Sequence, residues 1–298
     1  MFSAQDIKIG MIAQTGAGMP TTGNLLMVDY SENSLVLTKD QEAVDSATSK
    51  PNRAGAGSRR GKVKVTGQFK FRIHADDSFD MMLGSLLSAD WDGATLKPGS
   101  KKKRFAMVVE MTDEEDNVTR DEVHDCEVTK ITFSAENSAG LEATVDFTGI
   151  DVVTSAGEST LTRVASANTL ELIGDEVTDI TVNGVDIDVY TKLDISIEQP
   201  REGVYVLGSN TAVAVTASAR RNSGGSLAYL RQHGALPGFT GSAQGLSFNL
   251  GEFYAVEFPA IHATWPKATY SGAQLESTVD FVAGYDNTEK CDVMFTRL

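Results

Sequence analysis

One seven-residue sequence occurs twice in this chain and limits the folds that it can adopt. Leu141–Phe147 (LEATVDF) returns as Leu275–Phe281 (LESTVDF), with only the third residue changed. Each copy follows the same order of patterns: an alternating strand-like segment, a short helix-like segment and further strand-like runs. A chain made from two copies of one small β unit is more typical of a structural building block than of an enzyme. Such units usually join edge to edge.

Composition narrows the class of protein. The 298 residues fit two medium-sized domains, each large enough to bury its own core. With 41 acidic against 26 basic residues, the formal net charge is -15. Tight binding of nucleic acid depends on Lys and Arg at phosphates, so this balance disfavours it, but a surface past which nucleic acid slides is compatible with it. Two cysteines, no start typical of a signal peptide and no long apolar run predict a protein that folds in a reducing cytoplasm without entering a membrane.

The pattern along the chain predicts a mainly β fold in two tandem repeats. We expect an N-terminal arm over residues 1–24, a first repeat over 25–151, a linker over 152–168 and a second repeat over 169–298. Each repeat is expected to be a β-sandwich or half-barrel unit with one short helix. Residues 39–61 inside the first repeat are polar and do not alternate, and they predict a long loop that is functional or disordered.

Alternation and capping signals place individual elements. Residues 63–73 alternate as a strand, and Asp76 to Ser78 cap a predicted helix over Phe79–Leu87. Asn183-Gly184 between two alternating runs predicts a β-hairpin. In the second half, residues 213–219 are expected to repeat the alternating strand. Residues 222–226 are then expected to lead a helix through Leu227 and Leu230 to His233-Gly234.

No catalytic, cofactor or metal motif is present. The four histidines are scattered without metal-ligand spacing, and residues 55–62 lack both the glycine pattern and the following helix of a phosphate loop. The acidic run at 113–116 has neither the alternating ligands nor the glycine of a calcium loop, and it predicts a solvated hairpin tip. The sequence therefore favours a protein that is not an enzyme and needs no cofactor.

The repeated strand separates into an apolar and a polar face. The polar face is acidic, and it is either an ordinary solvent face or a functional lining. The strand at 63–73 instead carries a basic polar face with Lys64, Lys70 and Arg72. We hypothesise that the sheet of one repeat continues into the next, with charge complementarity helping to select the partner edge. The acidic polar face consists of Glu142, Thr144 and Asp146 in the first copy and Glu276, Thr278 and Asp280 in the second.

Together, the alternating strands, the short helix after the strand at 63–73, the long loop before it and the acidic-faced terminal strand resemble the major tail tube proteins of long-tailed bacteriophages. The resemblance spans both halves and implies the duplicated version, in which one chain supplies two tube-fold units. It implies that three chains close a pseudo-hexameric ring, and that rings stack into a virion tail tube that conducts the DNA genome during ejection. Assembly in the host cytoplasm and contacts with the tape measure, tail terminator and distal tail proteins are also implied.

The resemblance gives the polar residues roles. The six acidic and hydroxyl residues of the repeated strand become lumen-lining candidates that let DNA slide without specific binding. The basic strand departs from a uniformly negative wall, and its residues are either paired within the sheet or directed elsewhere. The loop at 39–61 is expected to contact the adjacent ring, for example at the acidic hairpin 110–125. The candidates for contacts between subunits or rings are Arg53, Arg59, Arg60, Lys64, Lys70 and Arg72.

Two alternative interpretations remain at this stage. A tail-end or adaptor protein would share the fold but form a single ring. A two-domain β-sandwich that binds carbohydrate or protein would carry clustered exposed aromatic residues, whereas aromatic residues make up only 7% of this chain.

Overall fold

The computed structural model describes residues 2–45, 57–74, 76–165, 171–187, 189–230, 244–271 and 274–298. Within these ranges the chain is mainly β, as the sequence predicts, with one α-helix, α1 (Asp77–Leu87), and a short 3₁₀ helix, η2 (Gly174–Glu176). No helix in this part of the chain is long and apolar enough to cross a membrane.

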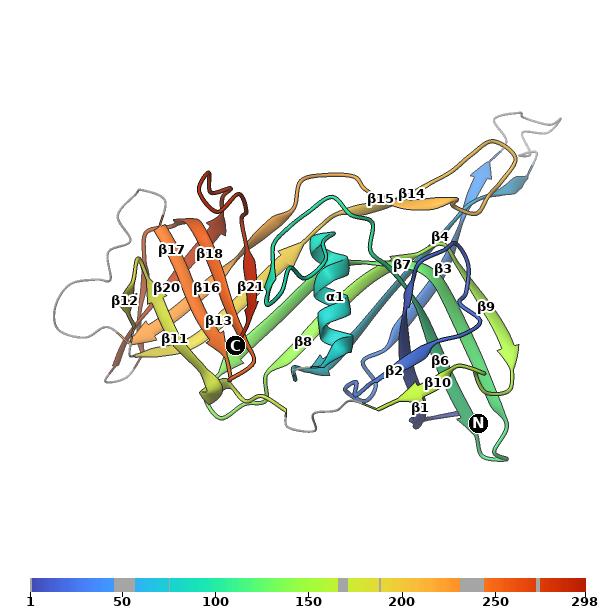
Figure 1. Cartoon of the computed structure of the whole chain (residues 1–298), viewed down its shortest axis with the longest axis horizontal. Helices are drawn as coiled ribbons and strands as arrows, with labels where there is room; N and C mark the ends of the chain where they lie inside the picture. The colour runs from blue at the N-terminus through green and yellow to red at the C-terminus, as the bar shows by residue number, and fades with distance from the viewer. Residues whose placement is uncertain are drawn as a thin grey trace, which may run out of the picture.

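Eight antiparallel strands form one continuous sheet, the long sheet, which runs through both halves of the chain (Figure 1). The order across it is β3–β4–β8–β7–β13–β16–β20–β19. β7 and β13 join the two halves through pairs running from Glu136↔Lys192 to Lys130↔Glu198. The strands are β3 (Val36–Asp45), β4 (Ser58–Arg72), β8 (Glu142–Gly149), β7 (Val118–Glu136), β13 (Tyr190–Glu198), β16 (Asn222–Leu230), β20 (Gln274–Ala283) and β19 (Lys267–Ser271).

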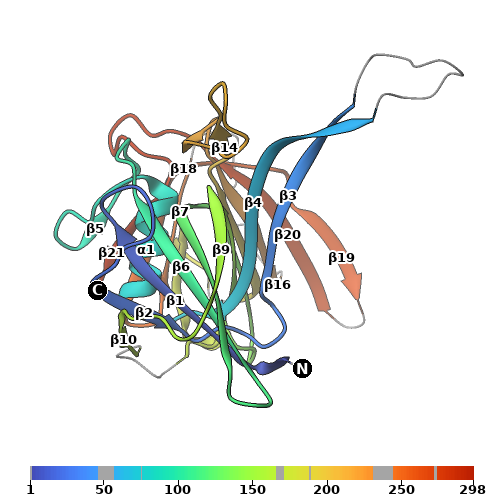
Figure 2. The ribbon, with the colours of Figure 1, turned by 90° about the vertical axis from the view of Figure 1, so that its right-hand side faces the viewer.

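A second layer of strands covers one face of the long sheet. Figure 2 shows strands of this layer together with α1 on one side, and β3, β4, β19 and β20 on the other. In the first half the layer contains β1 (Phe2–Gln14), β2 (Asn24–Val28), β6 (Arg104–Asp113), β9 (Asp151–Ala156) and β10 (Thr162–Val164). In the second half it contains β11 (Val177–Val182), β12 (Val185–Asp186), β17 (Gln244–Leu250), β18 (Tyr254–Ala263) and β21 (Met294–Arg297), joined at its edge by β5 (Thr95–Leu96).

The two halves repeat one strand order. In the long sheet, the first half has the order β3–β4–β8–β7 and the second half has the matching order β13–β16–β20–β19. The repeated signature occupies the equivalent strands β8 and β20. In the second layer, β1 pairs with β2 and β6, as β11 pairs with β12 and β17. The β11–β12 hairpin turns at Asn183 and Gly184, both with positive φ, which confirms the Asn-Gly prediction.

The prediction of a helix from Asn222 is wrong for residues 222–230, because these residues form the strand β16. Two glycines explain the difference, because both lie where neighbouring backbone approaches closely. A Cβ on Gly225 would lie 1.9 Å from the carbonyl oxygen of Asp194, and one on Gly224 would lie 2.5 Å from that of Phe281. The glycines therefore permit tight strand packing rather than a turn. The end of the expected helix, at 233–234, lies outside the described residues.

The strand expected over residues 213–219 also has a different role. Its central part is β15 (Ala214–Ala217), which pairs with β14 (Arg201–Val204) in a separate two-stranded ribbon. The position next to β13 in the long sheet, where a repeat of β4 is needed, is taken by β16.

Three segments expected outside the sheets are paired within them. Residues 7–14 of the expected arm pair with β6, and the expected linker contains β9, on β7, and β10, on β2. In place of the loop expected at 39–61, β3 and β4 continue as a paired ribbon as far as Asp45↔Ser58 and form an arm that leaves the body (Figure 2). Both faces of this arm are exposed, so no alternation marks it in the sequence. Residues 46–56 lie outside the described residues.

One hydrophobic cluster fills the space between the layers and includes residues from both halves. The helix predicted at 79–87 is confirmed, with Asp76 as its N-cap. The helix contributes Phe79, which meets the edge of the Tyr254 ring at 5.5 Å between centroids. The Tyr254 hydroxyl donates to Asp80 (2.9 Å), and Asp80 also pairs with Arg297, so α1 is fixed to the second half of the chain.

β7 belongs to both layers and changes direction between them at Asp125. Residues up to Cys126 pair with β6 or β9, whereas residues from Glu127 onward pair with β8 and, from Lys130, with β13. Asp125 has a φ of 54°, and its buried carboxylate accepts from the Gly18 backbone N–H (3.0 Å) and pairs with Arg104. Burial acts to raise the pKa of Asp125, but these hydrogen bonds and charges, with that of His124, outweigh it and hold the pKa below its ordinary value.

The first prediction concerns this corner. Asn also adopts positive φ, so Asp125→Asn keeps the backbone and removes only the charge. We expect the free energy of unfolding at pH 7 to fall by roughly 1–3 kcal/mol. Because the folded pKa is depressed, the carboxylate stabilises the fold above its unfolded pKa, and this contribution is lost as pH falls through the folded pKa. Urea unfolding should show the difference between the variant and the parent shrinking below about pH 4. A difference that stays constant down to pH 3 would contradict this role.

Candidate functional site: the polar face of the long sheet

The face of the long sheet turned away from the second layer is the polar face. Along each strand, apolar residues such as Val145 and Ile131 point into the core, and the alternate residues form this face. Its basic and acidic residues nearly balance. They are Lys64, Lys70, Arg72, Lys130, Lys192 and Lys267 against Asp40, Glu136, Glu142, Asp146, Asp194, Glu198, Glu276 and Asp280.

All six lumen-lining candidates lie on the polar face. The residues that alternate with them, among them Ala143 and Val279, are buried in the core. β8 and β20 are separated by β7, β13 and β16, so the candidates form two groups at different positions across one sheet. The first group is Glu142, Thr144 and Asp146 on β8, and the second is Glu276, Thr278 and Asp280 on β20.

Most of the lysines on the polar face are paired with carboxylates of neighbouring strands. Lys70 Nζ lies 2.9 Å from Glu142, and this hydrogen bond is the main reason why the pKa of Glu142 falls below its ordinary value. Lys267 Nζ lies 2.6 Å from Asp280. On the central strands, Lys192 Nζ lies 2.7 Å from Glu136 and 3.5 Å from Asp194. The basic and acidic strands β4 and β8 thus complement each other within one half, whereas the halves themselves join through β7 and β13.

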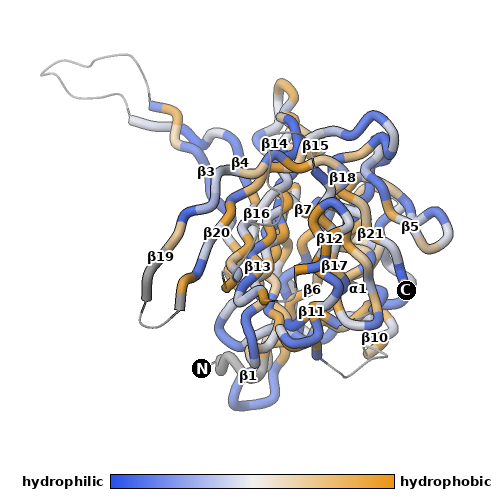
Figure 3. Tube along the Cα trace, turned by 90° about the vertical axis from the view of Figure 1, so that its left-hand side faces the viewer, coloured by the Kyte–Doolittle hydropathy of each residue, from blue (hydrophilic) through white to orange (hydrophobic). Residues whose placement is uncertain are grey.

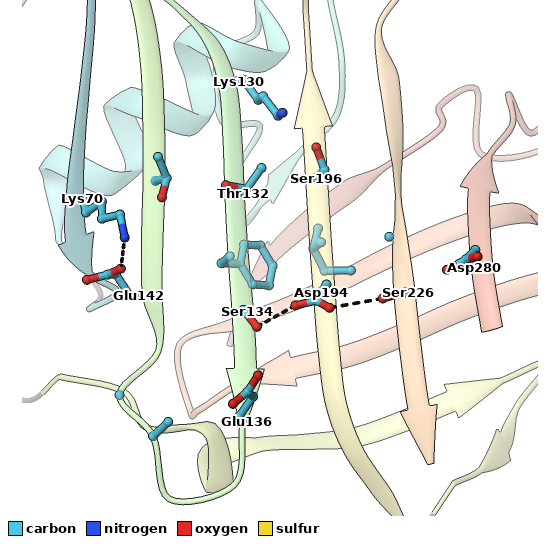
Figure 4. A pocket seen from close by; sticks show the side chains of 16 residues that line it. Lys70, Lys130, Thr132, Ser134, Glu136, Glu142, Asp194, Ser196, Ser226 and Asp280 are labelled. Carbon is cyan, nitrogen blue, oxygen red and sulfur yellow. Dashed lines mark hydrogen bonds and ion pairs between the residues drawn. The ribbon is translucent and has the colours of Figure 1, made fainter. Parts of the chain in front are cut away.

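The centre of the polar face is a shallow hollow lined by small polar groups. Figure 4 shows Asp194 between two hydroxyls, with Ser134 donating at 2.6 Å and Ser226 at 3.2 Å. Thr132 and Ser196 lie beside them on the adjoining strands. The hydroxyls of Ser134 and Ser226 thus already bond to a carboxylate of the same chain, whereas Lys130 lines the same hollow on β7.

The basic residues expected at contacts between subunits fall into two groups. Arg59 and Arg60 are exposed on the arm, and Arg53 lies outside the described residues. Lys64, Lys70 and Arg72 lie on the polar face. Arg72 lies 3.5 Å from Glu171 of its own chain, so both Lys70 and Arg72 have intrachain partners.

The acidic hairpin proposed as the partner of the loop at 39–61 is the β6–β7 hairpin. Glu110 is buried and paired with Arg163 at 2.8 Å, so the exposed acids are those of the turn, Glu114, Glu115 and Asp116. Figure 1 places this turn and the arm at opposite ends of the first half.

The two strands at the edges of the long sheet were not predicted from the sequence. In the described part of the chain, β3 pairs only with β4, and β19 pairs only with β20. Large apolar side chains are exposed near both edges: Val36 on β3 is 54% exposed, and Trp265, just before β19, is 78% exposed. Figure 3 shows β3 and β19 reaching out on the same side of the molecule. The signal available in the sequence was a large hydrophobic residue that lies outside the apolar faces that form the core.

The described residues contain no group of His, Cys, Asp and Glu that could hold a metal ion. Burial raises the pKa of the Cys126 thiol well above its ordinary value, and it raises that of Cys291 to about 11. Both cysteines are therefore unreactive at neutral pH.

Comparison with known proteins identifies a family. A family model described as "Phage tail tube protein" matches residues 4–252. Among solved structures, the chain is similar to a chain in the cryo-EM structure of the anti-feeding prophage (AFP) baseplate, 6-fold symmetrised, with 8% sequence identity and a TM-score of 0.38. The match covers 50% of this chain and 91% of that one. No curated protein matches.

Proposed function

The chain belongs to the phage tail tube protein family and is a structural component of a phage tail, and we propose that it is the subunit whose long sheet forms the wall of the tube. In this proposal three copies close a pseudo-hexameric ring, and rings stack into a tube that conducts DNA during ejection. The protein is a building block of the virion rather than an enzyme. It assembles in the host cytoplasm with the tape measure, tail terminator and distal tail proteins.

One observation carries the proposal: the chain already contains one unit-to-unit junction of a continuous sheet. Two units with the same strand order stand side by side through β7 and β13, and both outer edges are open in the described structure. A segment of this kind can extend only by adding further copies at its edges. Closure into a ring satisfies both edges at once and leaves none for uncontrolled pairing.

The polar face supports a role as the lumen wall. A wall rich in free Lys and Arg would hold DNA through the release of counterions at many phosphates. On this face Lys70, Lys192 and Lys267 are held by carboxylates, so their charges are largely compensated. The remaining acids, among them Asp146 and Glu276, add a weak repulsion that keeps the duplex moving.

The arm supports stacking of rings. The arm, which includes Arg59 and Arg60, leaves one end of the first half, and the acidic β6–β7 turn lies at the other (Figure 1). Stacking copies end to end brings unlike charges together. The Leu207 side chain at the tip of the β14–β15 ribbon is fully exposed and is a further candidate for this contact.

Electron microscopy of the purified protein tests the proposed function directly. We expect rings with three-fold symmetry and pseudo-six-fold outline that stack into tubes. Single rings that never stack, at any concentration, would instead identify an end or adaptor protein. A stable monomer at high concentration would contradict both, because open sheet edges favour association.

A second prediction concerns the lining. Asp146→Lys with Glu276→Lys places free cations on the polar face without removing a carboxylate that pairs with lysine. We expect tubes of this variant to sediment with duplex DNA at low salt and to release it as salt increases. Asp186→Lys with Glu252→Lys is the matched control, because it makes the same change of charge at exposed positions of the second layer. Equal retention of DNA by both variants would place the polar face outside the lumen.

A third prediction concerns stacking. Arg59→Glu with Arg60→Glu should leave ring formation intact but shorten tubes several-fold at low salt, because like charges then meet across the ring interface. Adding Glu114→Arg and Glu115→Arg to the same chain should restore tube length in negative-stain images. If the four-site variant forms tubes no longer than the two-site variant, these groups do not face one another.

A further inference from the structure

The junction inside the chain specifies how its outer edges can pair. At the β7–β13 junction, Thr132 lies opposite Ser196. Each of these two residues also pairs with a neighbouring strand of its own half, β8 and β16 respectively. Thr132 lies opposite Thr144 of the repeated signature on β8. Starting from the repeated signature, the strand pairings can therefore be followed outward in both halves to find equivalent residues.

Tracing the same path in the second half identifies the equivalents at the edges. Thr278 corresponds to Thr144 in the signature, and Thr278 lies opposite Lys267, so Lys267 corresponds to Thr132. The other side of the junction is traced from Lys70, which lies opposite Thr144. Its counterpart opposite Thr278 is Ala228.

Counting along these two strands completes the path. Thr66 and Gly224 lie four residues before Lys70 and Ala228, respectively, and are therefore equivalent. Gly224 lies opposite Ser196, and Thr66 lies opposite Thr38. Thr38 of β3 is thus the equivalent of Ser196.

An irregularity in the strands confirms this alignment independently. Against β8, β7 shifts its register between Val128 and Lys130, where Val128 pairs with Phe147. In the second half, Ala263 pairs with Phe281, the residue equivalent to Phe147. Val128 and Ala263 each lie four residues before the traced positions on β7 and β19, so the shift is repeated in register.

We propose that β19 of one copy pairs antiparallel with β3 of a second copy, with Lys267 opposite Thr38 and Trp265 opposite Asp40. The proposal rests on the proposed function, because it requires copies to join edge to edge. It adds the two strands involved and their register, which fixes the order of the halves around the ring. Every ring interface between chains is then a copy of the junction between the halves of one chain.

The faces of the sheet to which the side chains point agree with this register. Phe133 and Ile195 lie opposite one another at the internal junction and are both buried. Their equivalents at the edges are Ala268 and Leu37, which belong to the core-facing rows of their strands. A slip by one residue would turn both to the polar face. In the same register Trp265, which shares the polar face with Lys267, stands directly opposite Asp40 of the second copy.

Disulfide crosslinking in assembled rings tests the register. Residues directly opposite in an antiparallel pair have Cα atoms about 4.5–5.5 Å apart, which suits a disulfide. We expect Lys267→Cys with Thr38→Cys to give dimers and covalently closed trimers on mild oxidation, visible on non-reducing gels. The matched controls, Lys267→Cys with Val36→Cys or with Asp40→Cys, should crosslink several-fold less. Both native cysteines are buried and give little background.

The outcomes separate this inference from the proposed function. Rings that crosslink better in either control pair, or in none, overturn the register while the tube function stands. Failure of all the proteins, including the parent, to form rings or tubes overturns both. A second pair of positions tests the same register: Trp265→Cys with Asp40→Cys should crosslink in rings as Lys267→Cys with Thr38→Cys does. Rings that crosslink at the first pair and not at this second pair would also overturn the register.

Discussion

The rest of the structure depends on the hydrogen-bonding requirement of the peptide backbone at the edges of the long sheet. Each open edge presents a row of N–H and C=O groups whose spacing suits another strand. Between the halves, this requirement is met inside the chain by β7 and β13. At β3 and β19 the described structure offers no strand to meet it, so the geometry that joins the halves also provides a template for joining chains.

A template of this kind is useful only if the chain holds one curvature, and several contacts between the halves fix it. Arg201, which leads into the β14–β15 ribbon of the second half, is buried against Glu127 of β7 and donates to Val128 O at 2.9 Å. Just after β14, the Tyr205 hydroxyl donates to Val63 O at 2.7 Å. These contacts, the shared hydrophobic cluster and α1 join the two halves around one core, although the sequence led us to expect separate cores.

The sequence predicted those parts of the fold in which one face is buried. Strands such as β8 and the helix around Phe79 bury one side, so their periodicity is visible. The arm has no buried face, and its strands were taken for a loop. β16 was taken for a helix because the close approach that requires Gly225 depends on Asp194, a residue distant in sequence. The polar face was predicted for single strands, but its charge balance depends on which strands become neighbours.

That balance changes the electrostatic argument for a DNA channel. The chain carries a formal charge of -15, yet its acids and bases nearly cancel on the polar face. A strongly acidic wall would repel the duplex and also concentrate cations, whereas a wall of free bases would bind it. Lysines held at 2.6–2.9 Å from carboxylates on the neighbouring strand form ion-pair dipoles, whose field falls off faster with distance than that of a free charge. In the proposed lumen, the paired lysines would offer a duplex little attraction across the intervening water, and the remaining acids would add the weak repulsion.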